Sequence, residues 1–172
     1  MILKNYTKKE QKLPLFGIGP ALMLGIGAFS AVSMILAVYV FKIGELPGIW
    51  IIISRIIGAV FIMLGVLIWF FGAVKSDIDD NIIDNRLSTN GIFAYVRNPM
   101  YSGIWMMITG ISCMWHNLFA IPVFLINWLI LTVVLKQTEE KWLLSLHGAE
   151  YEEYKKHVNR LIPCIRAYVH MN

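Results

Sequence analysis

Long runs of apolar positions dominate this chain, and two polar segments interrupt and follow them. The first run extends from Leu13 to Phe41 and the second from Leu46 to Val74. Each is longer than the ~20 residues that an α-helix needs to cross ~30 Å of hydrocarbon. Each run therefore predicts one membrane-spanning helix.

A third apolar region, from Met100 to Leu135, is too long for one span. It is interrupted at Trp115-His116-Asn117, which predicts a tight helical hairpin. The first arm has about 15 residues, which is short for a span and suits a tilted or partly interfacial helix. We therefore predict an all-α polytopic membrane protein with about four transmembrane helices.

The pattern changes after the last apolar run, where Glu139 and Glu140 begin a polar tail. One interpretation is a new helix that Thr138 caps and the two glutamates stabilise in its first turn. The other is a continuing helix, because no breaker precedes Glu139. Gly148 is expected to end this helix. A short amphipathic helix is predicted next, over Ala149 to Val158, and it ends before Pro163.

These elements suggest two parts of the chain. Residues 1–75 hold an N-terminal cytosolic segment and two membrane helices. Residues 76–172 hold a polar central loop, the helical hairpin and the C-terminal tail, which we expect to act as one structural unit. No cleavable signal peptide is expected, because the first run exceeds a 7–15-residue signal core.

Composition agrees with a membrane protein. Hydrophobic residues make up 58% of the chain and the mean hydropathy is +0.64. Soluble domains contain roughly 45–50% apolar residues, and a soluble core of this size has no room for the excess.

Positive charges predict the orientation, because Lys and Arg concentrate on the cytosolic side of short loops. The first loop carries only Lys42, the loop around His116 carries none, and Arg55 lies inside the second run, where it is expected to snorkel to the outer surface. Both termini and both polar segments are therefore predicted to be cytosolic. The net charge of +4 suits anionic lipid headgroups, and no basic stripe for nucleic acid stands apart from the membrane. The basic residues on the predicted cytosolic side are Lys4, Lys8, Lys9, Lys12, Lys75, Arg86, Arg97, Lys136, Lys141, Lys155, Lys156, Arg160 and Arg166.

Several other features predict structure without chemistry. Cys113 and Cys164 fall on opposite sides of the predicted membrane, so no disulfide is expected between them. The histidines are scattered without ligand spacing, and no metal site is predicted. Gly17-x-Gly19 and Gly25-x-Gly27 are expected to allow close helix packing. The acidic residues Asp77, Asp79, Asp80 and Asp84 predict a solvated connector.

The central loop contains the candidate chemistry. Pro99 predicts that a helix begins at or just after it, which leaves the backbone N–H groups of Met100, Tyr101 and Ser102 unpaired. Such a helix terminus favours a carboxylate or phosphate, and Arg97 adds a positive charge beside it. The loop alone leaves two interpretations open. It is either an anion site, or an interfacial anchor in which Arg97 contacts phosphates and Tyr95 and Tyr101 join the headgroup belt.

The C-terminal tail favours a site. It brings Glu139 and Glu140 to the membrane surface, followed by Tyr151, Tyr154 and Arg160. If this tail folds back onto the Arg97 loop, the two segments form a cytosolic pocket with aromatic rings, cations and two carboxylates.

At these residues the chain resembles the superfamily of isoprenylcysteine carboxyl methyltransferases and phospholipid N-methyltransferases. The resemblance covers roughly residues 87–163. The family pattern usually has His where this chain has Asn98, whose amide can still donate and accept hydrogen bonds. The residues that carry the resemblance are Arg97-Asn98-Pro99-Met100-Tyr101-Ser102-Gly103, Gly110, Glu139-Glu140, Gly148, Tyr151, Tyr154, Arg160 and Pro163.

The resemblance implies an integral membrane enzyme that uses S-adenosylmethionine and methylates a lipophilic acceptor, either the carboxylate of a prenylated cysteine-like compound or the amine of a lipid. It implies that Glu139, Glu140 and Arg160 are catalytic. The implied cofactor-binding residues are Tyr95, Arg97, Asn98, Pro99, Tyr101, Gly103, Glu140, Tyr151 and Tyr154.

Two other classes of protein remain open on the sequence. A membrane reductase of the sterol-reductase type shares a related C-terminal motif but uses NADPH, and a scaffold without catalysis would use the polar segments only as anchors. The acceptor and the oligomeric state are not predicted.

Overall fold

The computed structural model describes residues 18–76 and 86–169, and within these ranges the chain is helical. The N-terminal lysines and the acidic residues Asp77 to Asp84 lie outside the described residues. The helices are α1 (Gly19–Ile35), η1 (Leu36–Val40), α2 (Ile49–Ala73), η2 (Gly91–Ala94), α4 (Pro99–Met114), α5 (Ala120–Gln137), α6 (Glu139–His147) and α7 (Ala149–His157).

Three helical segments are long and apolar enough to cross a membrane: Gly19–Val40, Ile49–Ala73 and Ala120–His147. The predicted hairpin is confirmed, since α4 and α5 flank a turn at Trp115 to Phe119. With 16 residues, α4 is shorter than the other three, and its crossing of the membrane stays a prediction. The described chain is thus an all-helical protein with three candidate membrane helices.

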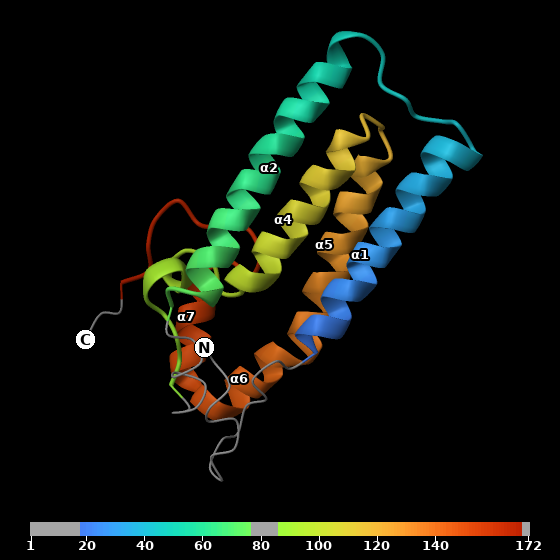
Figure 1. The fold of residues 1–172 in the computed structure, drawn as a ribbon. Helices are drawn as coiled ribbons and strands as arrows, with labels where there is room; N and C mark the ends of the chain where they lie inside the picture. Colours follow the sequence, from blue (N-terminus) through green and yellow to red (C-terminus); the bar gives the residue numbers. More distant parts are fainter. Residues whose placement is uncertain (1–17, 77–85, 170–172) are drawn as a thin grey trace.

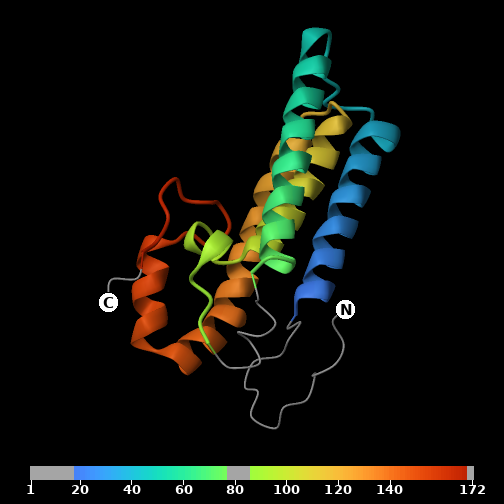
Figure 2. The same ribbon diagram turned by 60° about the vertical axis from the view of Figure 1, so that its left-hand side comes forward.

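The long helices run alongside one another, and the short helices gather at one end (Figure 1). Helices α2 and α4 are antiparallel neighbours (Figure 1), and α1 packs against both α4 and α5. Figure 2 shows α6, α7 and η2 together at the end where α2 stops and α4 starts. Both polar segments of the sequence therefore lie at the same end of the bundle.

Glycines set the distance between α2 and α4. Gly58, Gly65 and Gly72 recur at intervals of seven, so they share one face of α2. A Cβ atom added to Gly65 would lie 2.6 Å from the carbonyl oxygen of Gly103, and one added to Gly110 would lie 2.5 Å from that of Gly58. The two backbones touch because neither carries a side chain there.

The prediction for the glycines of α1 was largely wrong. A Cβ at Gly25 would meet nothing within 4 Å, and one at Gly27 would only reach the Ile108 side chain at 3.9 Å. Gly19 does allow a close approach, since its Cβ would lie 2.9 Å from the Tyr101 hydroxyl. Gly17 lies outside the described residues. A polar contact instead joins α1 to α5: the Asn127 amide donates to the Ser30 hydroxyl over 2.7 Å.

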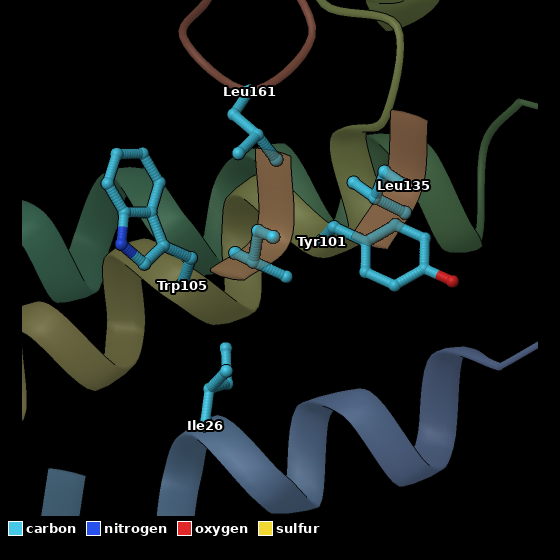
Figure 3. Packing of buried hydrophobic residues seen from close by; sticks show 6 residues of the cluster. Ile26, Tyr101, Trp105, Leu135 and Leu161 are labelled. Carbon is cyan, nitrogen blue, oxygen red and sulfur yellow. The ribbon is translucent and has the colours of Figure 1, made fainter. Parts of the chain in front are cut away.

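A buried apolar cluster connects the membrane helices to the C-terminal tail (Figure 3). Leu161, from the tail, points into it, and its neighbours come from α1, α4 and α5. The tail is therefore packed against the bundle. The members of the cluster are Ile26, Tyr101, Trp105, Leu131, Leu135 and Leu161.

The chain turns at Thr138, so of the two interpretations the new helix that begins at Glu139 is confirmed and the continuing helix is wrong. Thr138 has φ −117° and ψ −89°, and α6 begins at Glu139. The Thr138 hydroxyl does not cap α6 but donates to the Val134 carbonyl over 2.8 Å. This back-bonding competes with the regular helix. The predicted end at Gly148 is confirmed; its φ of +51° suits glycine, and α7 follows at once.

Candidate functional site

The central loop and the C-terminal tail are joined along their backbones. Val96 and Asn159 form a parallel β-bridge, and the Arg97 N–H donates to the Asn159 carbonyl over 2.9 Å. The Asn98 side chain adds a second link, since its amide donates to the Arg160 carbonyl over 3.1 Å. The predicted convergence of the two polar segments is present in the fold.

A buried carboxylate lies at the centre of this junction. Glu140 accepts hydrogen bonds from Arg160 through Nε at 2.6 Å and through a terminal nitrogen at 2.9 Å. A terminal nitrogen of Arg97 lies 3.2 Å from the same carboxylate. The side chains of Arg97 and Glu140 are only 8% and 9% exposed. Two guanidinium groups therefore share one carboxylate, and the cluster keeps an excess positive charge of one.

Two tyrosines of α7 line the same junction. Tyr151 is buried and its hydroxyl accepts a hydrogen bond from Arg97 over 3.2 Å. Tyr154 donates to the Phe93 carbonyl over 2.5 Å, which holds η2 against α7. Burial raises the pKa of Tyr151 to about 12, and the negative charge of Glu140 adds to this shift while Arg97 opposes it. Tyr151 is therefore a neutral phenol at physiological pH.

The start of α4 meets the other glutamate. The Tyr101 hydroxyl donates to Glu139, so α4 and α6 are tied together beside the charged cluster. The expectation of three unpaired N–H groups was wrong for Ser102, whose N–H donates to the Asn98 carbonyl over 3.0 Å. This is the first regular hydrogen bond of α4, which begins at Pro99 as predicted.

Three further predicted residues lie around the junction. Pro99 packs on Gly72 of α2, and Gly103 faces the Gly65 backbone, so both help to seat α4 against α2. Tyr95 is 38% exposed, and its carbonyl accepts from the N–H of Cys164 over 2.7 Å. The cofactor roles of these residues stay predictions.

The interfacial-anchor interpretation is wrong for Arg97 and Tyr101. Both side chains are buried and bonded to protein groups, namely Glu140 and Tyr151 for Arg97 and Glu139 for Tyr101. Buried side chains cannot contact headgroups, so these two residues belong to the protein interior. Tyr95, with its larger exposure, still suits an interfacial position.

The sequence did not single out Asn159 or Phe93, which contribute backbone carbonyls to the site. Such contacts leave no side-chain signal. His147 was also missed: its side chain is 7% exposed, and its Nε2 has no hydrogen-bond partner among the described residues. No helical spacing pointed to it, because Gly148 separates His147, the last residue of α6, from Tyr151 on α7.

One polar atom of the cluster is buried without a hydrogen-bond partner within residues 18–76 and 86–169. The Nε of Arg97 is buried and has no hydrogen-bond partner in the described part of the chain. A buried, unpaired donor on a cation is costly. Together with the excess positive charge, it fits a ligand that carries a carboxylate or phosphate group.

The chain belongs to the phospholipid methyltransferase family, whose sequence model matches residues 32–150, more than half of the chain. Among curated proteins it is 37% identical over 83 residues to a protein-S-isoprenylcysteine O-methyltransferase of Schizosaccharomyces pombe, covering 48% of this chain and 35% of the relative. A methanethiol S-methyltransferase of Crocosphaera subtropica is 36% identical, covering 46% of this chain and 30% of that protein.

A protein-S-isoprenylcysteine O-methyltransferase of Tribolium castaneum is 33% identical over 86 residues, which cover 49% of this chain and 30% of the relative. The chain thus aligns with about a third of the length of these relatives. No solved structure matches the chain.

Proposed function

We propose that this protein transfers a methyl group from S-adenosylmethionine to a lipophilic acceptor at the cytosolic face of the membrane. The family match over residues 32–150 carries the proposal. Candidate acceptors are the carboxylate of a prenylated cysteine-like compound and the amine of a lipid. The names of the relatives, which concern an isoprenylcysteine and methanethiol, support a small or lipophilic acceptor.

The charged cluster supports binding of this cofactor. Bound S-adenosylmethionine supplies an activated sulfonium methyl group and also carries a carboxylate. The free Nε of Arg97 and the excess charge of the cluster suit that carboxylate. Asn98 and Tyr101 are placed beside Arg97 at the start of α4, and we assign them to the same part of the cofactor.

The other cofactor residues are assigned by position. Tyr151 and Tyr154 lie on α7, on the tail side of the cluster, and Tyr95 lies on the loop side. We propose that these aromatic rings enclose the adenosine or acceptor side. Pro99, through its ring, and Gly103, through its backbone, seat α4 on α2 and so hold the Arg97 loop in place.

The catalytic contribution of the chain is positioning together with proton removal. Aligning two bound reactants can lower a barrier by roughly 7–11 kcal/mol. A carboxylate acceptor has no proton to lose and needs no base. An amine acceptor must be neutral, and we assign removal of its proton to Glu139, because Glu140 is already paired with two guanidinium groups. Arg160 fixes Glu140 through two hydrogen bonds.

Direct binding tests the proposal. The full chain, purified in detergent, should bind radiolabelled S-adenosylmethionine saturably, and Arg97→Ala and Glu140→Ala should each abolish that binding. Glu153→Ala is the matched control, because Glu153 is an exposed acid on α7 whose salt bridge to Lys156 lies at the surface. All variants should insert into membranes equally.

Each alternative has its own outcome in this assay. Saturable NADPH binding without S-adenosylmethionine binding would reject methyl transfer in favour of a reductase. Binding of neither S-adenosylmethionine nor NADPH would favour a scaffold without catalysis. If the donor binds, incubation with lipid extracts and mass spectrometry of the product identifies the acceptor.

A further inference from the structure

The residues after Arg160 form a loop that turns apolar side chains outward. Ile162, Ile165 and Val169 are 53%, 99% and 73% exposed. Single exposed apolar residues are ordinary, but these three lie within eight positions of one short loop. None of the three has a role in the site described above.

Two backbone hydrogen bonds hold the loop in place, one on each side of its tip. The Cys164 N–H donates to the Tyr95 carbonyl over 2.7 Å, and the Tyr168 N–H donates to the Ala94 carbonyl over 2.8 Å. Tyr168 also stacks edge-on against Tyr154 of α7, with ring centroids 5.5 Å apart. Ile165 is therefore presented outward by a fixed backbone.

Leu161 sets the depth of the loop along the bundle. It is buried in the cluster that contains Trp105 of α4 and Leu131 of α5 (Figure 3). Each of these two residues lies six positions from the site end of its helix, which corresponds to ~9 Å along the axis. Leu131 also belongs to the candidate membrane span Ala120–His147. Leu161 thus packs beside residues about two helical turns inside the site end of the bundle.

Figure 2 shows the loop, in red, rising beside the bundle on the side away from α1. Arg166, at the tip, is exposed and adds a positive charge, which suits anionic headgroups. A long arginine side chain can reach the phosphates while its neighbours stay among the acyl chains.

We propose that residues 161–169 form a membrane anchor that inserts Ile162, Ile165 and Val169 into the cytosolic leaflet beside the candidate active site. The occupant of this apolar face is bilayer lipid. Irregular backbone is not tolerated in bare hydrocarbon, so the loop lies at the boundary between headgroups and acyl chains, where amphipathic segments insert ~5–10 Å. Because the loop is bonded to η2 and follows Arg160, insertion fixes the height of the site relative to the membrane.

Spin-label accessibility tests the anchor on the full chain in vesicles that contain anionic phospholipid. Labels are placed at Ile165→Cys and Val169→Cys, with Lys156→Cys on the exposed face of α7 as control. The native thiols are removed by Cys113→Ala and Cys164→Ser; a serine hydroxyl can still accept the hydrogen bond from the Asn159 N–H. Oxygen should reach the loop labels several-fold better than a water-soluble nickel chelate, and this order should reverse at the control.

Two outcomes would overturn the anchor. The nickel chelate could reach the Ile165 label as easily as the Lys156 label, which would put the loop in water. Alternatively, neither reagent could reach the Ile165 label, and the spectra of labels on different chains could broaden one another. That result would make a second copy of this chain the occupant of the apolar face. Binding of S-adenosylmethionine, measured on the same samples, separates this result from a failure of the proposed function.

A second measurement needs no change to the cysteines. Vesicles carrying a phospholipid with a diazirine near its headgroup should cross-link peptides that contain Ile165 and spare those from α7. Ile165→Asp should reduce this cross-linking several-fold. Equal labelling of both peptides would contradict insertion.

Discussion

Glu140 is a single carboxylate between two guanidinium groups, and its partners come from segments far apart in the chain. Arg97 lies in the central loop and Arg160 in the C-terminal tail. All three groups are largely shielded from solvent, so each charge depends on the others for compensation. Removing one member of such a buried set leaves the remaining charges unpaired.

Glu140→Gln should therefore destabilise the protein by about 3–5 kcal/mol, the range for a broken buried ion pair. The measurement is thermal unfolding in detergent micelles. Glu153→Gln removes an acid of similar size whose salt bridge to Lys156 is exposed, and it should leave the unfolding midpoint unchanged. Equal effects of the two substitutions would show that the cluster is not buried in solution.

Tyr151 predicts a loss of stability at high pH. Its pKa is raised to about 12 in the fold from an ordinary value of 10. A raised pKa in the folded state contributes stability that is present below pH 10 and is lost as the pH rises through 12. The loss amounts to about 3 kcal/mol for a shift of this size.

Chemical unfolding at several pH values between 9 and 12 measures this dependence. Tyr151→Phe cannot ionise and should flatten the decline. An unchanged decline in Tyr151→Phe would assign the effect to another group, such as Tyr154, whose pKa is also raised by burial.

At the scale of elements, the contact between α2 and α4 depends on backbone touching backbone. A side chain on Gly65 would meet the Gly103 carbonyl oxygen and the Met107 nitrogen within 3 Å. Neither atom can move without its helix. The glycine stripe therefore positions α4, and with it the loop that carries Arg97.

Gly65→Ala should push the two helices apart and lower the stability by about 1–3 kcal/mol or more, as overpacking does. Gly25→Ala in α1 is the control. Its new methyl group enters open space, and the higher helix propensity of alanine predicts no loss. Thermal unfolding of both variants checks this, and a loss in Gly25→Ala as large as in Gly65→Ala would contradict the proposed contact.

At the scale of the whole molecule, different segments gather at the two ends of the helix bundle. The loop between η1 and α2 lies at one end, and α6, α7 and η2 lie at the other (Figure 1). Because candidate membrane helices connect them, we predict that these ends face opposite sides of the membrane. The charge pattern predicts that the end with α6 is cytosolic.

Labelling of intact vesicles of known orientation tests this arrangement. Lys42→Cys, in the first loop, and Ser145→Cys, in α6, are both exposed and should react with a membrane-impermeant maleimide from opposite sides. Reaction of both from the same side would exclude the spanning bundle. Reaction of Ser145→Cys from the outside would reverse the predicted orientation.

The apolar runs and local stop signals were enough to predict the helices. Run length predicted α2 from Leu46 to Val74, within three residues of its observed bounds at either end. The polar break at Trp115 predicted the hairpin, Pro99 the start of α4, and Gly148 the end of α6, because each acts within its own turn of chain. The sequence also indicated that Arg97, Glu140 and Arg160 are charged residues at a membrane surface.

Only the tertiary structure decided which of these groups meet and which glycines touch. Glu140 bonds to residues more than 15 positions away on either side, and Gly58 meets Gly110 across two helices. The glycines of α1 were the more obvious candidates for close packing and proved to be mostly open. Local patterns report how a segment folds, whereas pairing depends on the register and rotation of whole helices, which no short stretch of sequence contains.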